Sequence, residues 1–222
     1  MQFYYIEMCF SEDASLFSFV FGIISSLILI TCGNSESSDT NKAIGYFFMF
    51  VCLMQLIEYI IWKDTNCETG LNNLGSNIGP IFNHLQPIVF LIIASIFIKS
   101  QNIIPTNLLI IANIIYICYV VYKYDEYIQE PTNLCTRTNN LGHLDWNWKR
   151  KFNYTFYFAI SILNFINFYN NLNVSFSMGL SYLLLFTSIT NFNKNVGEFW
   201  CLMVTGIPLA NLILQKIFNV NN

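Results

Sequence analysis

Charged residues are scarce in this sequence. Asp, Glu, Lys and Arg together make up 10% of its 222 residues, against roughly a quarter in a typical soluble domain. So few charged side chains cannot cover a water-facing surface, which excludes an ordinary soluble domain. Basic runs are also short: the longest is Lys149 to Lys151, and the net charge is −3. We therefore expect no nucleic-acid partner.

Two further features are missing. The first fourteen residues hold three acids (Glu7, Glu12 and Asp13) and no basic residue, whereas a cleavable signal peptide begins with a basic region. We therefore expect the first apolar run to be retained as a membrane span. The chain also has only two histidines and no HExxH, HxxxH or G-x-S-x-G pattern, so we expect no cofactor, no metal and no catalytic residues.

Apolar residues, by contrast, are abundant. They make up 55% of the chain, and mean hydropathy is +0.48. A helix needs roughly twenty apolar residues to cross a bilayer, and seven runs approach or reach that length. The predicted spans are 15–32, 43–62, 78–99, 105–123, 153–170, 174–190 and 196–218. The sequence thus predicts an all-α fold: a single domain, 1–222, forming an integral bundle of seven transmembrane helices.

One polar loop is long, 124–152, between the fourth and fifth predicted spans. With seven spans, this loop shares one side of the membrane with the N-terminus and with loops 63–77 and 191–195; we call it side A. The C-terminus and the other three loops lie on side B. Most of the Lys and Arg residues are on side A, which by the positive-inside rule would make side A cytoplasmic.

The cysteines indicate the opposite orientation. Cys67 and Cys135 lie in two side-A loops, and a disulfide between them would require an oxidising compartment. Cys9 is a rival partner on the same side. We favour side A, and with it the N-terminus, on the extracellular or lumenal face of a multi-pass membrane protein.

The second span contains an acid, Glu58. Gln55, Glu58, Tyr59 and Trp62 follow helical spacing and share one stripe. A charged side chain within a span costs roughly 2.5–3.5 kcal/mol and by default marks a functional site. We predict that Glu58 binds an ion or a proton, with Gln55 orienting it and Tyr59 and Trp62 lining the cavity. The alternative is a purely structural bond to a neighbouring helix.

The third predicted span carries Asn83, His84 and Gln86 just before Pro87. Proline removes a backbone donor and clashes with the carbonyl four residues earlier. We therefore predict a helix break near His84 and assign these three polar residues to the same ion or proton pathway as Glu58.

The seventh predicted span begins with Glu198 and Trp200. Glu198 joins the predicted pathway, and Trp200 joins the lining of a cavity that opens to side A beneath the long loop. Trp146 and Trp148 in that loop are expected to be anchors at the membrane interface. The side-B half holds mostly Phe, Ile, Leu and Gly and is expected to be plain.

Several short motifs resemble a known group. "QLIEYIIW", "NHLQP", "GHLDW" and "GEFWC", spread in this order over residues 55–201, are similar to motifs of small multi-span membrane proteins from giant DNA viruses. The lead-in "CETGLNNLGSNIGP" at 67–80 also looks like that group. The resemblance implies a viral origin and a shared seven-span fold. It implies no reaction, and no functional residue is carried over from it.

These observations favour a channel or carrier for protons or small cations, with the lipid bilayer and the ion as partners and a homo-oligomer left open. One alternative is a membrane-embedded hydrolase or lipid-modifying enzyme. If metal-dependent, it would need Glu58, Glu198 or Cys201 to join His84 and His143 as ligands. A seven-span ligand receptor and a structural membrane protein are further alternatives. We expect that the chain is not an enzyme.

Overall fold

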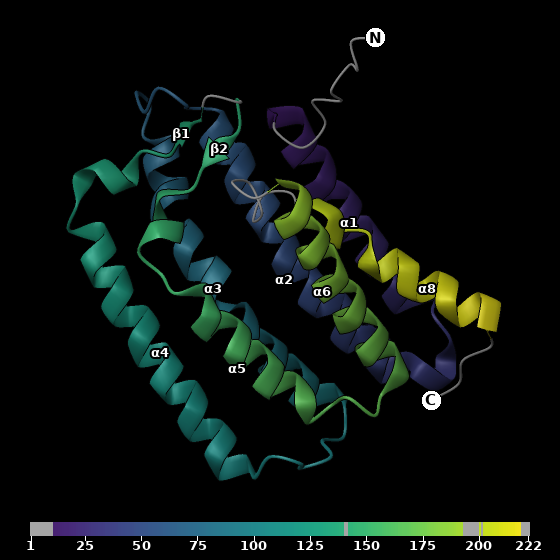
Figure 1. Cartoon of the computed structure of the whole chain (residues 1–222). Coiled ribbons are helices and arrows are strands. Elements are labelled where there is room, and N and C mark those ends of the chain that lie inside the picture. The colour runs from purple at the N-terminus through teal and green to yellow at the C-terminus, as the bar shows by residue number, and fades with distance from the viewer. Residues whose placement is uncertain (1–10, 140–141, 193–199, 201, 219–222) are drawn as a thin grey trace.

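The computed structural model describes residues 11–139, 142–192, 200 and 202–218. These residues form seven α-helices and one small two-stranded sheet (Figure 1). The helices are α1 (Glu12–Cys32), α2 (Ser38–Trp62), α3 (Leu71–Phe97), α4 (Thr106–Ile128), α5 (Tyr154–Ile166), α6 (Leu172–Phe192) and α8 (Ile207–Phe218).

Helices α1 to α4 are each long and apolar enough to cross a membrane, and they match the first four predicted spans. Three shorter apolar helical segments follow: Tyr154–Ile166, Leu172–Ser188 and Leu202–Ile217. Large apolar side chains point outward, for example from Phe17 of α1 and Val121 of α4. Such a surface suits lipid. The chain is therefore a multi-pass membrane protein.

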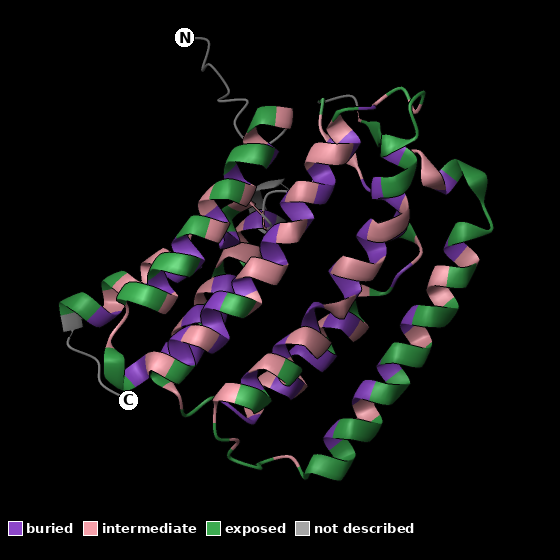
Figure 2. Ribbon diagram, turned by 180° about the vertical axis from the view of Figure 1, so that it is seen from behind, coloured by how far each residue is buried: buried purple, intermediate pink, exposed green. Residues whose placement is uncertain are grey.

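Helix α2 is the centre of the bundle. It lies between α1 and α3, and its side chains contribute to both apolar core clusters. Figure 2 shows α2 largely buried and α4 exposed along most of its length. Because α2 carries Glu58, the predicted functional acid sits on the helix that the rest of the fold encloses.

Two predicted spans differ from the structure. The span predicted at 153–170 is the helix α5 of 13 residues, which at 1.5 Å per residue covers about 20 Å of a core about 30 Å thick. In the span predicted at 196–218, residues 196–199 and Cys201 lie outside the described part, and a turn at Thr205 and Gly206 interrupts the helix before α8. Pro208 explains this turn: it clashes with the carbonyl of Val204 but is tolerated in the first turn of a new helix.

The long loop is folded rather than extended. Helix α4 continues to Ile128, and the strands β1 (Arg137–Thr138) and β2 (Leu144–Asp145) then pair antiparallel. The prediction that Trp146 and Trp148 are interfacial anchors is wrong. Both are at most 1% exposed, and their rings stack 5.0 Å apart.

Gly79 of α3 makes room for the ring of Trp148 to pack against the helix. A Cβ atom at this position would lie 2.6 Å from the Trp148 ring, so only glycine lets the loop settle so closely on the helix. The loop thereby forms a lining of the core rather than a surface feature.

The side-B half is not plain, contrary to expectation. Gln215 Nε2 of α8 donates to Asn41 Oδ1 of α2 over 2.7 Å and to Asn211 Oδ1 over 2.9 Å. Asn211 Nδ2 in turn donates to Ser177 Oγ of α6 over 2.7 Å. These residues are buried. Such amide networks hold membrane helices together where apolar burial gives little driving force.

Candidate functional site

Glu58 and Gln55 form a buried hydrogen-bonded pair near the side-A end of α2. Gln55 Nε2 donates to Glu58 Oε2 over 2.9 Å, and Glu58 is 3% exposed. The α-helix brings the two side chains together because they are three residues apart. Close by, Gly75 allows α3 to approach α2, since a Cβ there would lie 2.5 Å from Ile61. The acid therefore lies one turn from a tight contact between the two helices.

Tyr59 and Trp62 are half-buried at the same end of α2. The Lys63 ammonium lies over the Tyr59 ring, 5.3 Å from its centroid, and Lys63 also forms an ion pair with Glu12 of α1. Trp62 packs against the apolar core. Both residues lie at the side-A end of the helix. Neither of them lines the pocket that α2, α3, α5 and α6 enclose.

His84 lies in an aromatic cluster between α3, α4 and α5. Its Nδ1 is 3.1 Å from the hydroxyl of Tyr116, and its ring stacks on Phe152 with centroids 4.2 Å apart. His84 is fully buried, and its Nε2 has no hydrogen-bond partner within the described part of the chain. The predicted break is absent, because α3 runs as one helix through Pro87.

The polar residues of α3 bond instead to α5. Tyr154 donates to Asn83 Oδ1 over 3.0 Å, and Tyr157 donates to Gln86 Oε1 over 2.7 Å. Farther along, Asn164 Nδ2 donates to the carbonyl of Pro87 over 2.9 Å. Pro87 thus contributes an acceptor to helix packing.

Asn164 also pairs with Asn113 of α4. The two side-chain amides exchange hydrogen bonds of 2.7 and 2.9 Å. Because each amide both donates and accepts, the pair satisfies itself without water. Among the predicted site residues that the structure describes, Gln55 bonds to Glu58 on α2, while Asn83, His84 and Gln86 each contact α4 or α5.

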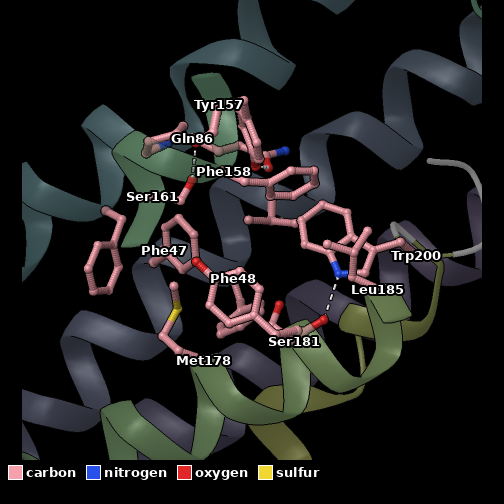
Figure 3. A pocket seen from close by; sticks show the side chains of 14 residues that line it. Phe47, Phe48, Gln86, Tyr157, Phe158, Ser161, Met178, Ser181, Leu185 and Trp200 are labelled. Carbon is pink, nitrogen blue, oxygen red and sulfur yellow. Dashed lines mark hydrogen bonds between the residues drawn. The ribbon is translucent and has the colours of Figure 1, made fainter. Parts of the chain in front are cut away.

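A pocket does exist, deeper in the bundle. It has a volume of about 40 Å³ and lies between α2, α3, α5 and α6 (Figure 3). Of the predicted site residues, Gln86 and Trp200 line it, and the Trp200 indole donates to the carbonyl of Ser181 over 2.9 Å. Phe47 and Met178, which also line it, give no signal in the sequence beyond ordinary apolar periodicity. Glu198 lies outside the described residues.

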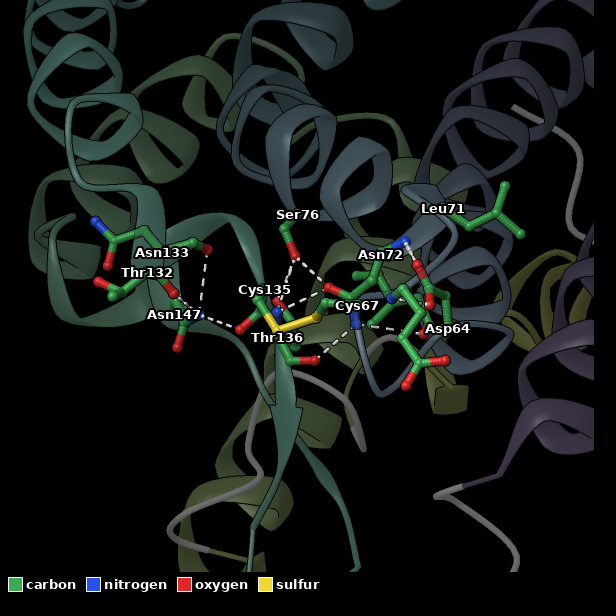
Figure 4. Close-up of a disulfide and its surroundings, with 12 residues drawn as sticks. Asp64, Cys67, Leu71, Asn72, Ser76, Thr132, Asn133, Cys135, Thr136 and Asn147 are labelled. Atoms are coloured by element: carbon green, nitrogen blue, oxygen red, sulfur yellow. Dashed lines mark hydrogen bonds between the residues drawn. A yellow bond between two sulfur atoms is a disulfide. The ribbon is translucent and has the colours of Figure 1, made fainter.

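We call the loop between α2 and α3 and the loop between α4 and α5 together the side-A cap, and a disulfide joins these two loops. Cys67 and Cys135, the pair favoured from the sequence, are bonded, with their Cα atoms 5.9 Å apart (Figure 4). The bond joins the loop after α2 to the folded loop after α4. Beside it, Ser76 and Thr136 hydroxyls lie 2.7 Å apart. The long loop, beneath which the cavity was predicted to open, is therefore fixed to the start of α3.

Asp64 organises the same region. Its Oδ1 accepts from the backbone N–H of Glu68 and Thr69, and its Oδ2 accepts from that of Asn72. Desolvation raises the pKa of Asp64, but these backbone hydrogen bonds outweigh it and lower the pKa to about 2. The carboxylate compensates the unpaired donors at the start of α3, which explains why α3 begins before the predicted span.

Among the described residues, no three His, Cys, Asp or Glu side chains are grouped so that they could hold a metal ion. Comparison of the chain with protein-family models, curated proteins and solved structures finds no match. These comparisons assign no chemistry to the site. The viral origin implied by the motifs stays a prediction.

Proposed function

We propose that this protein carries protons or small cations across the membrane, and that Glu58 is the group that binds them. The observation that supports this most is the buried Gln55–Glu58 pair on the central helix. An acid retained inside a membrane helix is costly and by default functional. Gln55 holds one carboxylate oxygen in place, as an ion-binding group requires.

The polar contacts of α3 supply the remainder of the proposed path. The imidazole of His84 and the hydroxyls of Tyr116, Tyr154 and Tyr157 can each donate and accept a proton. Because these side chains bond to one another between packed helices, we propose a carrier or a gated channel rather than a permanently open pore.

We further propose that all seven helices belong to the transmembrane bundle and that side A is extracellular or lumenal. The Cys67–Cys135 disulfide supports this orientation because such bonds persist in oxidising compartments. Cys32, exposed at the side-B end of α1, provides the test. A membrane-impermeant maleimide applied to intact cells should leave Cys32 unlabelled, whereas labelling before permeabilisation would reverse the orientation.

The function is tested by reconstitution. Purified protein in liposomes should conduct protons, Na⁺ or K⁺, measured one at a time under an imposed gradient and membrane potential, above the rate of protein-free liposomes. Flux of one cation that saturates with concentration supports the proposal. Rates equal to protein-free liposomes for all three cations, from acid to neutral pH, would contradict it. No contact among the described residues specifically favours the enzyme or receptor alternatives.

A further inference from the structure

The pocket between α2, α3, α5 and α6 contains a polar group that is not satisfied. Gln86 is 1% exposed and lines the pocket, and its Nε2 has no hydrogen-bond partner among the described residues. Its other end, Oε1, accepts from Tyr157. Exchanging the amide oxygen and nitrogen would not help, because one end of the amide would still be unpaired.

A second unsatisfied group lines the same pocket. The hydroxyl of Tyr182 on α6 has no hydrogen-bond partner within the described part of the chain. A buried donor without a partner costs about 1–3 kcal/mol. Two such groups from different helices around one cavity indicate a ligand that supplies the missing hydrogen bonds.

The remaining lining defines the character of this ligand. It is mostly aromatic and aliphatic, including Phe48, Phe90 and Met178, and no charged side chain is among the described residues that line it. Phe47 and Leu185 are only half-buried, which places this side of the pocket near the outer surface of the bundle. A molecule dissolved in the bilayer can therefore reach it.

We infer that this pocket binds an uncharged amphipathic molecule from the bilayer. Its hydroxyl or carbonyl head bonds to Gln86, and its single apolar chain leaves past the half-buried Phe47 and Leu185. The cavity of about 40 Å³ holds only the head and the first carbons. The inference goes beyond the proposed transport: the pocket shares Gln86 and Tyr157 with the proposed path, but the proposed ion-binding group, Glu58, does not line it.

Trp200 lines the pocket and serves as the reporter. The full-length protein in lipid nanodiscs is titrated with bromododecanol, whose bromine quenches tryptophan fluorescence on contact. Bromododecane, which lacks the hydroxyl, is the matched control. We expect quenching by the alcohol that saturates, that is relieved by unlabelled dodecanol, and that disappears in Trp200→Phe.

In Gln86→Met the apparent Kd for the alcohol should rise roughly three- to tenfold, the effect of losing one neutral hydrogen bond. Relief by dodecanol in the unaltered protein keeps the test valid even if this variant fails to fold. Quenching that grows without saturation, is equal for the two bromo compounds and persists in Trp200→Phe would overturn the inference. Glu58→Gln should bind the alcohol normally, so failure of transport and failure of this site are distinguishable.

Discussion

Asn72 and Thr136 exchange two hydrogen bonds across 64 positions of sequence. Asn72 Nδ2 donates to the Thr136 carbonyl, and the Thr136 N–H donates to Asn72 Oδ1, both over 2.8 Å. Both residues are fully buried. Side-chain contacts thus fix the loop after α4 to the first turn of α3, next to the Cys67–Cys135 disulfide.

Removing the disulfide should destabilise this cap. The two cysteines are 68 positions apart, for which loop-closure entropy gives a loss of roughly 4 kcal/mol in Cys67→Ser/Cys135→Ser. Cys118→Ser, which removes an exposed free thiol, is the control and should melt like the unaltered protein. Non-reducing mass spectrometry should recover a linked Cys67–Cys135 peptide, and two free thiols would contradict the account.

Asp64 should make the stability of the cap depend on pH. Its pKa is lowered to about 2 in the folded protein, against about 3.9 unfolded. The stabilisation that Asp64 gives the folded protein is therefore present above about pH 4 and is lost as the pH falls toward 2. Asp64→Asn should lower the melting temperature at neutral pH, and the difference should shrink in acid. Asp125→Asn, at an exposed position, should show no such loss. An equal effect of both substitutions would sink the assignment.

Gly79→Ala should disturb the packing of the long loop. The added Cβ would lie 2.6 Å from Trp148, and overpacking of this kind typically costs about 1–3 kcal/mol. Gly179→Ala in α6 is the control, because its added Cβ would meet no heavy atom of the described residues within 4 Å apart from the adjoining backbone of its own helix. Thermal melts and near-ultraviolet circular dichroism measure both. Equal stability of the two variants would show that the close contact is unimportant.

The amide pair Asn113–Asn164 should show energetic coupling. Hydrogen bonds between membrane helices average about 0.6 kcal/mol and reach about 1.7 kcal/mol, so a double-mutant cycle with alanine should give a value in that range. A matched cycle between Asn113 and Asn211, which lie on α4 and α8, should be additive. Additivity in the first cycle would mean that the reciprocal bonds contribute nothing.

Much of the architecture could be predicted from the sequence because it depends on local composition. Apolar runs of membrane length gave α1 to α4 within a few residues at most ends. The structure also joins Cys67 to Cys135, which follow different spans onto the same side. Gln55 and Glu58 lie together because helical spacing alone brings them together.

Other features depend on how helices pair, which periodicity does not reveal. Trp148 lies in a polar loop, and its burial depends on packing against residues far away in sequence, Gly79 among them. In the sequence, Asn41 and Gln215 are isolated polar residues. The packing of α2 against α8 brings them into hydrogen-bonding distance. Likewise, Phe47 and Met178 line the pocket because four helices leave a gap there.

The central claim is that Glu58 is the ion-binding group, and the most direct measurement is cation flux into liposomes containing Glu58→Gln. A glutamine keeps the shape and can still accept from Gln55, so the variant should fold and melt like the unaltered protein. Gly179→Ala, reconstituted alongside, controls for handling. We expect flux in Glu58→Gln to fall to the rate of protein-free liposomes, while Gly179→Ala retains it. Unchanged flux in Glu58→Gln, with unchanged pH dependence, would contradict the account.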